Sequence, residues 1–210
     1  MSKGLTTCVI LGWLLGLSCA ATARPKTEGK MAPRITLRVY DYAGLPAGLL
    51  SRALNQAGLI LEDAGVVVGR VVCTNDEPPG GCNQAPDPLN VALRIVPKPV
   101  PGADYGTLGY ASGQYITVNY SRVEEFADHS HVFLDRLLAC VVAHELGHVL
   151  LGADSHSAAG IMTACLTEKE LRLIRVMLIG FLPFQKERIR NYVLSQTRNL
   201  GAGSIALAQR

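Results

Sequence analysis

The chain of 210 residues has little excess charge of either sign and no long run of like charges. Its 20 basic and 17 acidic residues leave a formal net charge of only +3. Proteins that bind nucleic acid usually present a basic stripe, often interleaved with aromatic side chains, and aromatic residues make up only 6% of this sequence. We therefore expect no nucleic-acid partner.

The sequence also lacks an apolar run of the roughly 20 residues that a transmembrane helix needs. Its most apolar stretch is residues 8–17, which follow the positive charge of Lys3 and precede the small-x-small tripeptide of residues 21–23. These features are typical of a signal peptide, which we predict over residues 1–23. We expect a secreted or extracytoplasmic protein with no stable membrane span after signal removal; a retained anchor or lipid attachment at Cys19 are the alternatives.

No short CxxC pair is present, which argues against a structural zinc site made of thiolates. Four cysteines follow the signal peptide, an even number that suits disulfides in an oxidising compartment. Cys73 and Cys82 flank the turn-rich residues 74–81, so we predict a disulfide between them. The sequence leaves undecided whether Cys140 and Cys165 form a second disulfide.

The sequence shows no internal repeat and no long linker, and its 49% of hydrophobic residues can form one core of ordinary size. We predict one domain over residues 35–195. A flexible segment at residues 24–34 precedes it, and a flexible tail at residues 196–210 follows it. We expect the protein to be a monomer.

Hydrophobic periodicity predicts strands in the first half of the chain and mainly helices in the second half. The expected strands are residues 35–40, 66–73, 89–96, 108–111 and 115–120, the last two forming a hairpin or sheet edge. The expected helices are residues 46–64, a short helix capped by Ser121, 130–150, 167–179 and 183–195. This order predicts an α+β fold.

Two histidines four residues apart lie in the long helix predicted at residues 130–150. Because a helix turns by 100° per residue, His144 and His148 present their imidazoles on one face, where both can bind zinc. Glu145 lies beside the first histidine and is suited to act as general base on a water molecule at the metal. The uncharged neighbours at residues 140–143 predict a buried helix, in which unpaired imidazoles would be costly.

A glycine, a polar loop and a methionine follow this helix. Gly152 ends the helix, residues 153–156 form the loop, and Gly160-Ile161-Met162 comes next. The whole segment, HELGHVLLGADSHSAAGIM at residues 144–162, resembles the zincin peptidases, and specifically the metzincin clan with its pattern HExxHxxGxxH and a methionine turn. The resemblance implies these roles: zinc ligands His144 and His148, catalytic base Glu145, and Met162 as the turn methionine beneath the metal.

The third zinc ligand is ambiguous because the loop departs from the family spacing. Gly152 falls one place later than the family glycine, and His156 falls two places later than the family's third ligand. Asp154 has the family spacing, and some metzincins use aspartate there. The displaced glycine changes the angle at which the chain leaves the helix, so we favour His156, with Asp154 as the alternative.

The resemblance implies a zincin-like fold: a twisted mixed β-sheet of four to five strands with a backing helix, an active-site helix and C-terminal helices. It also implies a Zn²⁺-dependent endopeptidase whose peptide or protein substrate lies along an edge strand, here within residues 108–120. The alternative is a non-catalytic secreted protein of the same fold that binds zinc or peptides. A third hypothesis is a membrane-tethered interaction module with an accidental motif, which would bind no metal.

Overall fold

The computed structural model describes residues 32–74, 82–83, 87–99 and 107–208, with the backbone alone beyond residue 200. The described residues belong to a compact unit that begins at Ala32. The predicted signal peptide lies outside the described residues. Within the described ranges, no helix is both long and apolar enough to cross a membrane.

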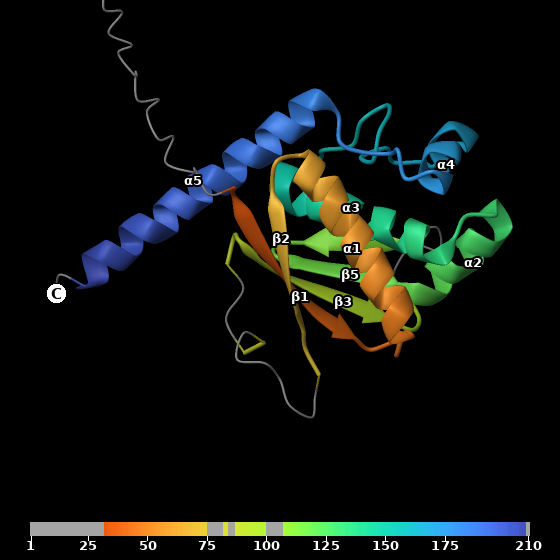
Figure 1. Ribbon diagram of the computed structural model, residues 1–210, viewed down its shortest axis with the longest axis horizontal. Coiled ribbons are helices and arrows are strands. Elements are labelled where there is room, and N and C mark those ends of the chain that lie inside the picture. The colour runs from red at the N-terminus through yellow and green to blue at the C-terminus, as the bar shows by residue number, and fades with distance from the viewer. Residues whose placement is uncertain (1–31, 75–81, 84–86, 100–106, 209–210) are drawn as a thin grey trace, which may run out of the picture. The chain divides into compact units, whose positions relative to one another are not determined.

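In the part of the chain that the structure describes, five strands form one mixed sheet in the order β2-β1-β3-β5-β4 (Figure 1). The strands are β1 (Arg34–Asp41), β2 (Val67–Val72), β3 (Asn90–Val96), β4 (Gly109–Ser112) and β5 (Tyr115–Asn119). β1 pairs in parallel with β2 and β3, and β3 pairs in parallel with β5. β4 pairs antiparallel with β5 and lies at the sheet edge, as predicted. The turn between them contains Gly113, whose φ of 57° favours glycine.

Five helices among the described residues accompany the sheet, which confirms the predicted α+β class. They are α1 (Ala47–Asp63), α2 (Tyr120–Ser130), α3 (Leu134–Leu151), α4 (Glu168–Arg175) and α5 (Pro183–Ala208). Alternate strand residues such as Leu37, Val39 and Leu93 are at most 1% exposed and belong to one core with the apolar faces of α1 and α3. Figure 1 shows α1, the expected backing helix, lying across the sheet.

Helix α3 is buried along most of its length because it packs against α1, α2, α5 and the strands β4 and β5. Every residue from Leu137 to Ala143 is buried, as are Leu146, Gly147 and Leu150. The prediction that the histidine motif lies on a buried helix is therefore confirmed. α3 presents this motif directly beside the sheet edge formed by β4.

Four helices have an end that differs from the sequence prediction by more than one residue. α2 begins at Tyr120 with Asn119 as its N-cap, so the expected cap at Ser121 is wrong. α3 begins at Leu134 rather than near Ser130, because the Ser130 hydroxyl donates back to the carbonyl of Phe126 in α2 and His131 ends α2 with φ of 52°. α4 has the predicted capping box at Thr167 but ends at Arg175, before the expected residue 179. α5 continues to Ala208, through residues expected to form a loose tail.

Cys73 and Cys82 form the predicted disulfide, with their Cα atoms 5.7 Å apart. Cys140 and Cys165 are not bonded to each other: Cys140 is buried in α3, whereas Cys165 is exposed. The second disulfide that the sequence left undecided is therefore not formed.

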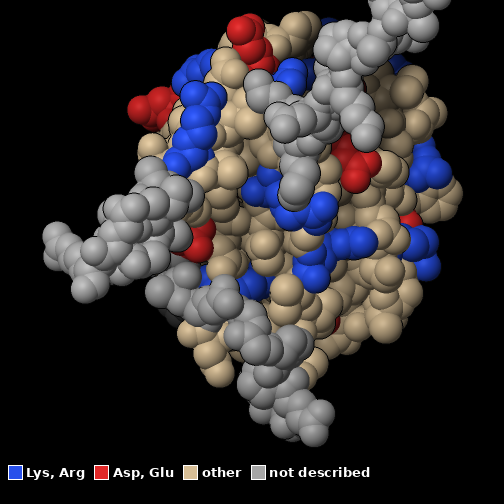
Figure 2. All heavy atoms as spheres, turned by 60° about the vertical axis from the view of Figure 1, so that its left-hand side comes forward, with Lys and Arg blue, Asp and Glu red and all other residues tan. Residues whose placement is uncertain are grey.

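One face of the molecule carries a group of basic side chains. On the face seen in Figure 2, several Lys and Arg side chains lie near the middle, while other Lys and Arg side chains and most Asp and Glu side chains lie toward the margin.

Candidate metal centre

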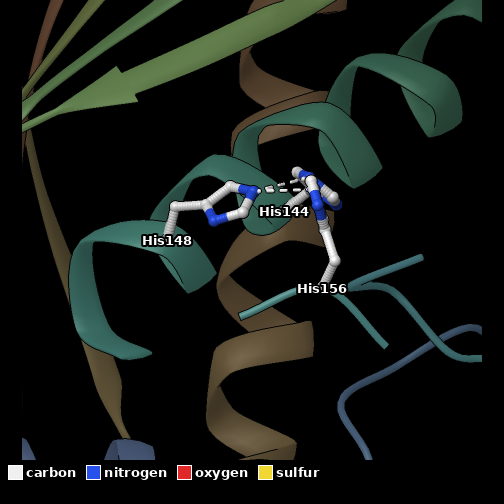
Figure 3. A group of neighbouring side chains, drawn as sticks. All are labelled: His144, His148 and His156. Atoms are coloured by element: carbon white, nitrogen blue, oxygen red, sulfur yellow. Dashed lines mark hydrogen bonds between the residues drawn. The ribbon is translucent and has the colours of Figure 1, made fainter. Parts of the chain in front are cut away.

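Three histidines from two elements point their rings toward one another (Figure 3). His144 and His148 come from α3, and His156 comes from the loop after α3. The Nε2 atom of His148 lies 3.0 Å from Nε2 of His144 and 3.1 Å from Nε2 of His156. One ligand atom from each ring fits within 4.8 Å of the others. The structure thus brings together the three histidines favoured from the sequence.

Hydrogen bonds fix which ring nitrogens face the cluster. Nδ1 of His144 lies 2.7 Å from the carbonyl oxygen of Ile161, which can only accept, so this nitrogen carries the proton and Nε2 keeps its lone pair. Nδ1 of His148 lies 3.4 Å from the carbonyl of Gly152 and 3.2 Å from the hydroxyl of Ser155. These contacts orient both rings with Nε2 inward.

Converging nitrogen lone pairs fit a bound zinc ion. The Nε2 atoms of His144 and His148 are 3.0 Å apart, and the lone pairs of two such nitrogens repel each other unless a proton or a cation lies between them. Ligand nitrogens in a tetrahedral zinc site, with bonds of about 2.0–2.1 Å, are roughly 3.3 Å apart. The observed separations are close to this value, so the three histidines could hold zinc with a fourth position left for water or substrate.

The surroundings keep the two helical histidines neutral. Burial is the main cause that lowers the pKa of His144 to about 4; the neighbouring His148 and His156 act in the same direction, and the Ile161 carbonyl opposes them. Burial also lowers the pKa of His148. Neutral imidazole is the form that binds metal, so protons compete weakly for these two nitrogens at neutral pH.

Asp154, the alternative third ligand, does not join the histidine cluster and is exposed. The difference originates at Gly152, which ends α3 with φ of 102°, a backbone conformation that L side chains rarely adopt. The chain therefore leaves the helix at an angle that returns residue 156, rather than residue 154, to the face of α3 that carries His144 and His148.

Glu145 is a buried carboxylate beside the cluster. Its side chain is 5% exposed, and burial raises its pKa to about 7. Its Oε2 atom is buried and has no hydrogen-bond partner among the described residues. A buried carboxylate without a partner is costly, and such groups occur at functional sites where water or substrate completes the bonding.

Met162 lies beneath the motif helix and is fully buried. Its carbonyl accepts a hydrogen bond of 2.8 Å from the Ser157 amide, and this bond closes a tight loop. Gly160 in that loop has φ of 78°, and a Cβ there would lie 2.8 Å from the carbonyl oxygen of Gly180. The position of Met162 agrees with the turn expected from the resemblance, and its role in supporting the metal stays a prediction.

A cleft of about 970 Å³ opens beside these groups, within the usual size range of ligand sites. His144, Glu145, His148 and His156 line it together with the edge strand β4. The cleft walls are otherwise mainly apolar. It can therefore hold an extended segment of peptide next to the histidines.

Several residues of the site could not be recognised from the sequence. Ser155, which contacts the His148 ring, was interpreted only as part of a polar loop. Gly109 allows β4 to approach the helix, since a Cβ there would lie 3.2 Å from Cγ of Glu145. Cys140 and Cys165 line the cleft as free thiols. Of these four, Gly109 alone carries a signal, because a glycine in a strand often marks a close approach.

No protein-family model matches the chain, and no curated protein sequence matches it either. Among solved structures, the chain is similar to the crystal structure of archaemetzincin from Methanopyrus kandleri. The two chains share 15% sequence identity with a TM-score of 0.49, over 78% of this chain and 97% of that chain.

Proposed function

We propose that the protein is a secreted zinc-dependent endopeptidase, in which His144, His148 and His156 hold the metal. One observation carries the proposal: three imidazole Nε2 atoms converge in an open cleft beside Glu145, whose buried Oε2 atom has no hydrogen-bond partner among the described residues. Structural metal sites are closed by a fourth protein ligand, whereas catalytic sites keep one position open. Three protein ligands in an open cleft therefore favour a catalytic metal site over a structural one.

Glu145 is the general base in this proposal. Bound zinc would polarise the substrate carbonyl and make a nearby water molecule more acidic. The Glu145 carboxylate takes a proton from that water and later donates it to the leaving amine. Both steps suit a carboxyl group with a pKa of about 7, since it can accept and release a proton near neutral pH. Burial by the surrounding helices provides that pKa.

The edge strand β4 is the proposed support for the substrate backbone. β4 is the last strand in the sheet order, and among the described residues it pairs with β5 alone, so its outer edge can accept an extended peptide as a further strand. Gly109, Tyr110 and Ala111 of this strand line the same cleft as the histidines. A peptide bond held along this edge would lie beside Glu145.

Secretion is part of the proposal and is supported by two features. Residues 1–23 have the pattern of a signal peptide. The disulfide between Cys73 and Cys82 is of the kind that persists in oxidising compartments. The mature protein would then begin near residue 24.

The test compares the zinc-loaded wild type with Glu145→Gln on a mixed peptide library, with mass spectrometry to detect new termini. We expect the wild type to cleave and the variant to bind one zinc ion but cleave at least about 100-fold more slowly, because it lacks the general base. Zinc binding without cleavage by the wild type would instead support the non-catalytic alternative. Absence of zinc in both proteins would contradict the metal centre.

A further inference from the structure

The sheet has a second face, opposite to the one that α1 and α3 cover, and this face carries arginines. Along β1 and β3 the apolar residues point toward the helices, so Arg38 and Arg94 alternate to the other side. Both are on central strands of the sheet, and Arg38 is only 3% exposed. Arg94 is partly buried. Arginines that lie away from solvent on central strands need a structural or a binding reason.

The strand register arranges these arginines around a small residue. Ala92 pairs with Arg38 on one side and with Tyr115 on the other, and Arg94 pairs with Tyr40. Because the Ala92 side chain is a single methyl group, space is left above it. A cavity of about 260 Å³ occupies this place.

The segment of Cys82 and Asn83 forms part of the opposite wall of the cavity. Both the Arg38 guanidinium and the Tyr40 hydroxyl donate to the carbonyl oxygen of Cys82, at 3.4 and 2.9 Å. The disulfide to Cys73 ties this segment to the end of β2. The position of Cys82 beside the cavity is thus linked covalently to Cys73.

Arg94 lacks an ion-pair partner for its charge and a hydrogen-bond partner for one of its donors among the described residues. It takes part in none of the ion pairs formed among the described residues, and its Nε atom is buried there without a hydrogen-bond partner. Its guanidinium carbon lies 5.3 Å from the ring centroid of Tyr115, which holds the side chain in place without using its donors. No carboxylate is among the described residues that line the cavity.

We propose that this cavity binds the carboxylate or phosphate group of a small organic molecule between Arg38 and Arg94. Guanidinium groups match such oxyanions with paired donors, and an N–H group without a partner gains most from them. Tyr40, Tyr42 and Tyr115 supply aromatic walls for the apolar part of the ligand. At about 30 Å³ per water-sized group, the volume admits on the order of ten non-hydrogen atoms.

The test is calorimetric titration of the purified zinc-loaded protein with benzoate and, separately, phenyl phosphate at constant ionic strength. We expect saturable binding of at least one probe at one site per chain, and the stronger of the two identifies the preferred oxyanion. Acetate and inorganic phosphate should bind at least about tenfold more weakly, because they leave the aromatic walls unused. Probes that show no saturation at millimolar concentration would overturn the proposal.

Two variants locate the site. Arg94→Gln should weaken binding about tenfold or more, as expected for loss of a charge-assisted hydrogen bond. Ala92→Val should also weaken it, because the added methyl groups fill the cavity without changing any charge. Thermal unfolding of each variant checks that it is folded.

Two controls distinguish binding in this cavity from binding elsewhere on the protein. Arg70→Gln removes the same charge from the exposed side of β2, outside the cavity, and should leave affinity within about twofold. Equal weakening by Arg70→Gln and Arg94→Gln would show non-specific charge attraction and overturn the proposal. His156→Ala should keep the binding, whereas its loss there would assign the probe to the metal centre.

Discussion

Gly147 of the motif helix packs directly against the side chain of Met162. A Cβ atom at position 147 would overlap the Met162 sulfur and would lie 2.9 Å from Cε1 of Phe181. The helix that carries His144 and His148 can therefore approach the methionine turn only with glycine at this position. This contact joins the turn to the helix whose histidines form the metal centre.

Gly147→Ala should consequently destabilise the protein, although alanine is the better helix former. We expect a loss of about 1–3 kcal/mol in the free energy of unfolding, as is usual for an overpacked core, together with weaker zinc binding. Urea denaturation and zinc titration provide the measurements. Gly58→Ala in α1 is the matched control: its Cβ would meet nothing within 4 Å, so it should be neutral or stabilising by up to about 1 kcal/mol.

The two candidates for the third ligand predict opposite results for a pair of variants. Removal of a residue that only orients a metal ligand lowers metal affinity by about 10- to 100-fold. His156 is proposed to bind the metal directly, so His156→Ala should weaken zinc binding by more than about 100-fold. Asp154→Ala should stay within about threefold of the wild type, because this residue lies outside the histidine cluster. Competition with a chromogenic chelator measures both affinities. The reverse order would assign the ligand to Asp154.

The free thiols should differ strongly in reactivity. Burial raises the pKa of Cys140 from 9.0 to about 12, so this thiol stays neutral in the folded protein, while Cys165 is exposed. We expect iodoacetamide at pH 8 to label Cys165 but not Cys140 in the native state, and both after denaturation. Peptide mapping by mass spectrometry identifies the sites. Rapid native labelling of Cys140 would contradict its burial.

The same shift has a consequence for stability. Because folding raises the pKa of Cys140, the folded state holds the thiol proton more tightly than the unfolded state does. The resulting contribution to stability is complete below pH 9 and is lost as pH rises through about 12. The measurement is the free energy of unfolding of the wild type and of Cys140→Ala between pH 9 and about 12. The stability lost by the wild type through Cys140 should be absent in Cys140→Ala.

The strands and the motif helix could be predicted because their signals are local. The alternation of Ile35, Leu37 and Val39 with polar residues indicated a strand, and the uncharged run before His144 indicated a buried helix. The pairing of Cys73 with Cys82 could also be predicted, because a turn-rich segment separates them by only nine positions. Each of these inferences needed only the neighbouring sequence.

Other features depend on distances between segments, which spacing in the sequence does not contain. Counting residues along the family pattern favours Asp154, which lies outside the histidine cluster, whereas His156 lies within it. Which of the two side chains approaches His144 and His148 depends on the path of the backbone after Gly152. The cavity between Arg38 and Arg94 depends on the register of β1 against β3. The displaced Gly152 is visible in the sequence and favoured His156, but the backbone angle itself is not, and the register of β1 against β3 leaves no mark in a single sequence.

Titration of metal-free protein with zinc, with peptide hydrolysis as the readout, is the decisive experiment for the proposed zinc peptidase. We expect no hydrolysis without metal, a linear rise as zinc is added, and a plateau at one zinc ion per chain. Glu145→Gln, treated identically, should bind the same single ion and stay inactive. Hydrolysis that is independent of zinc, or no hydrolysis at any zinc concentration, would contradict the proposed function.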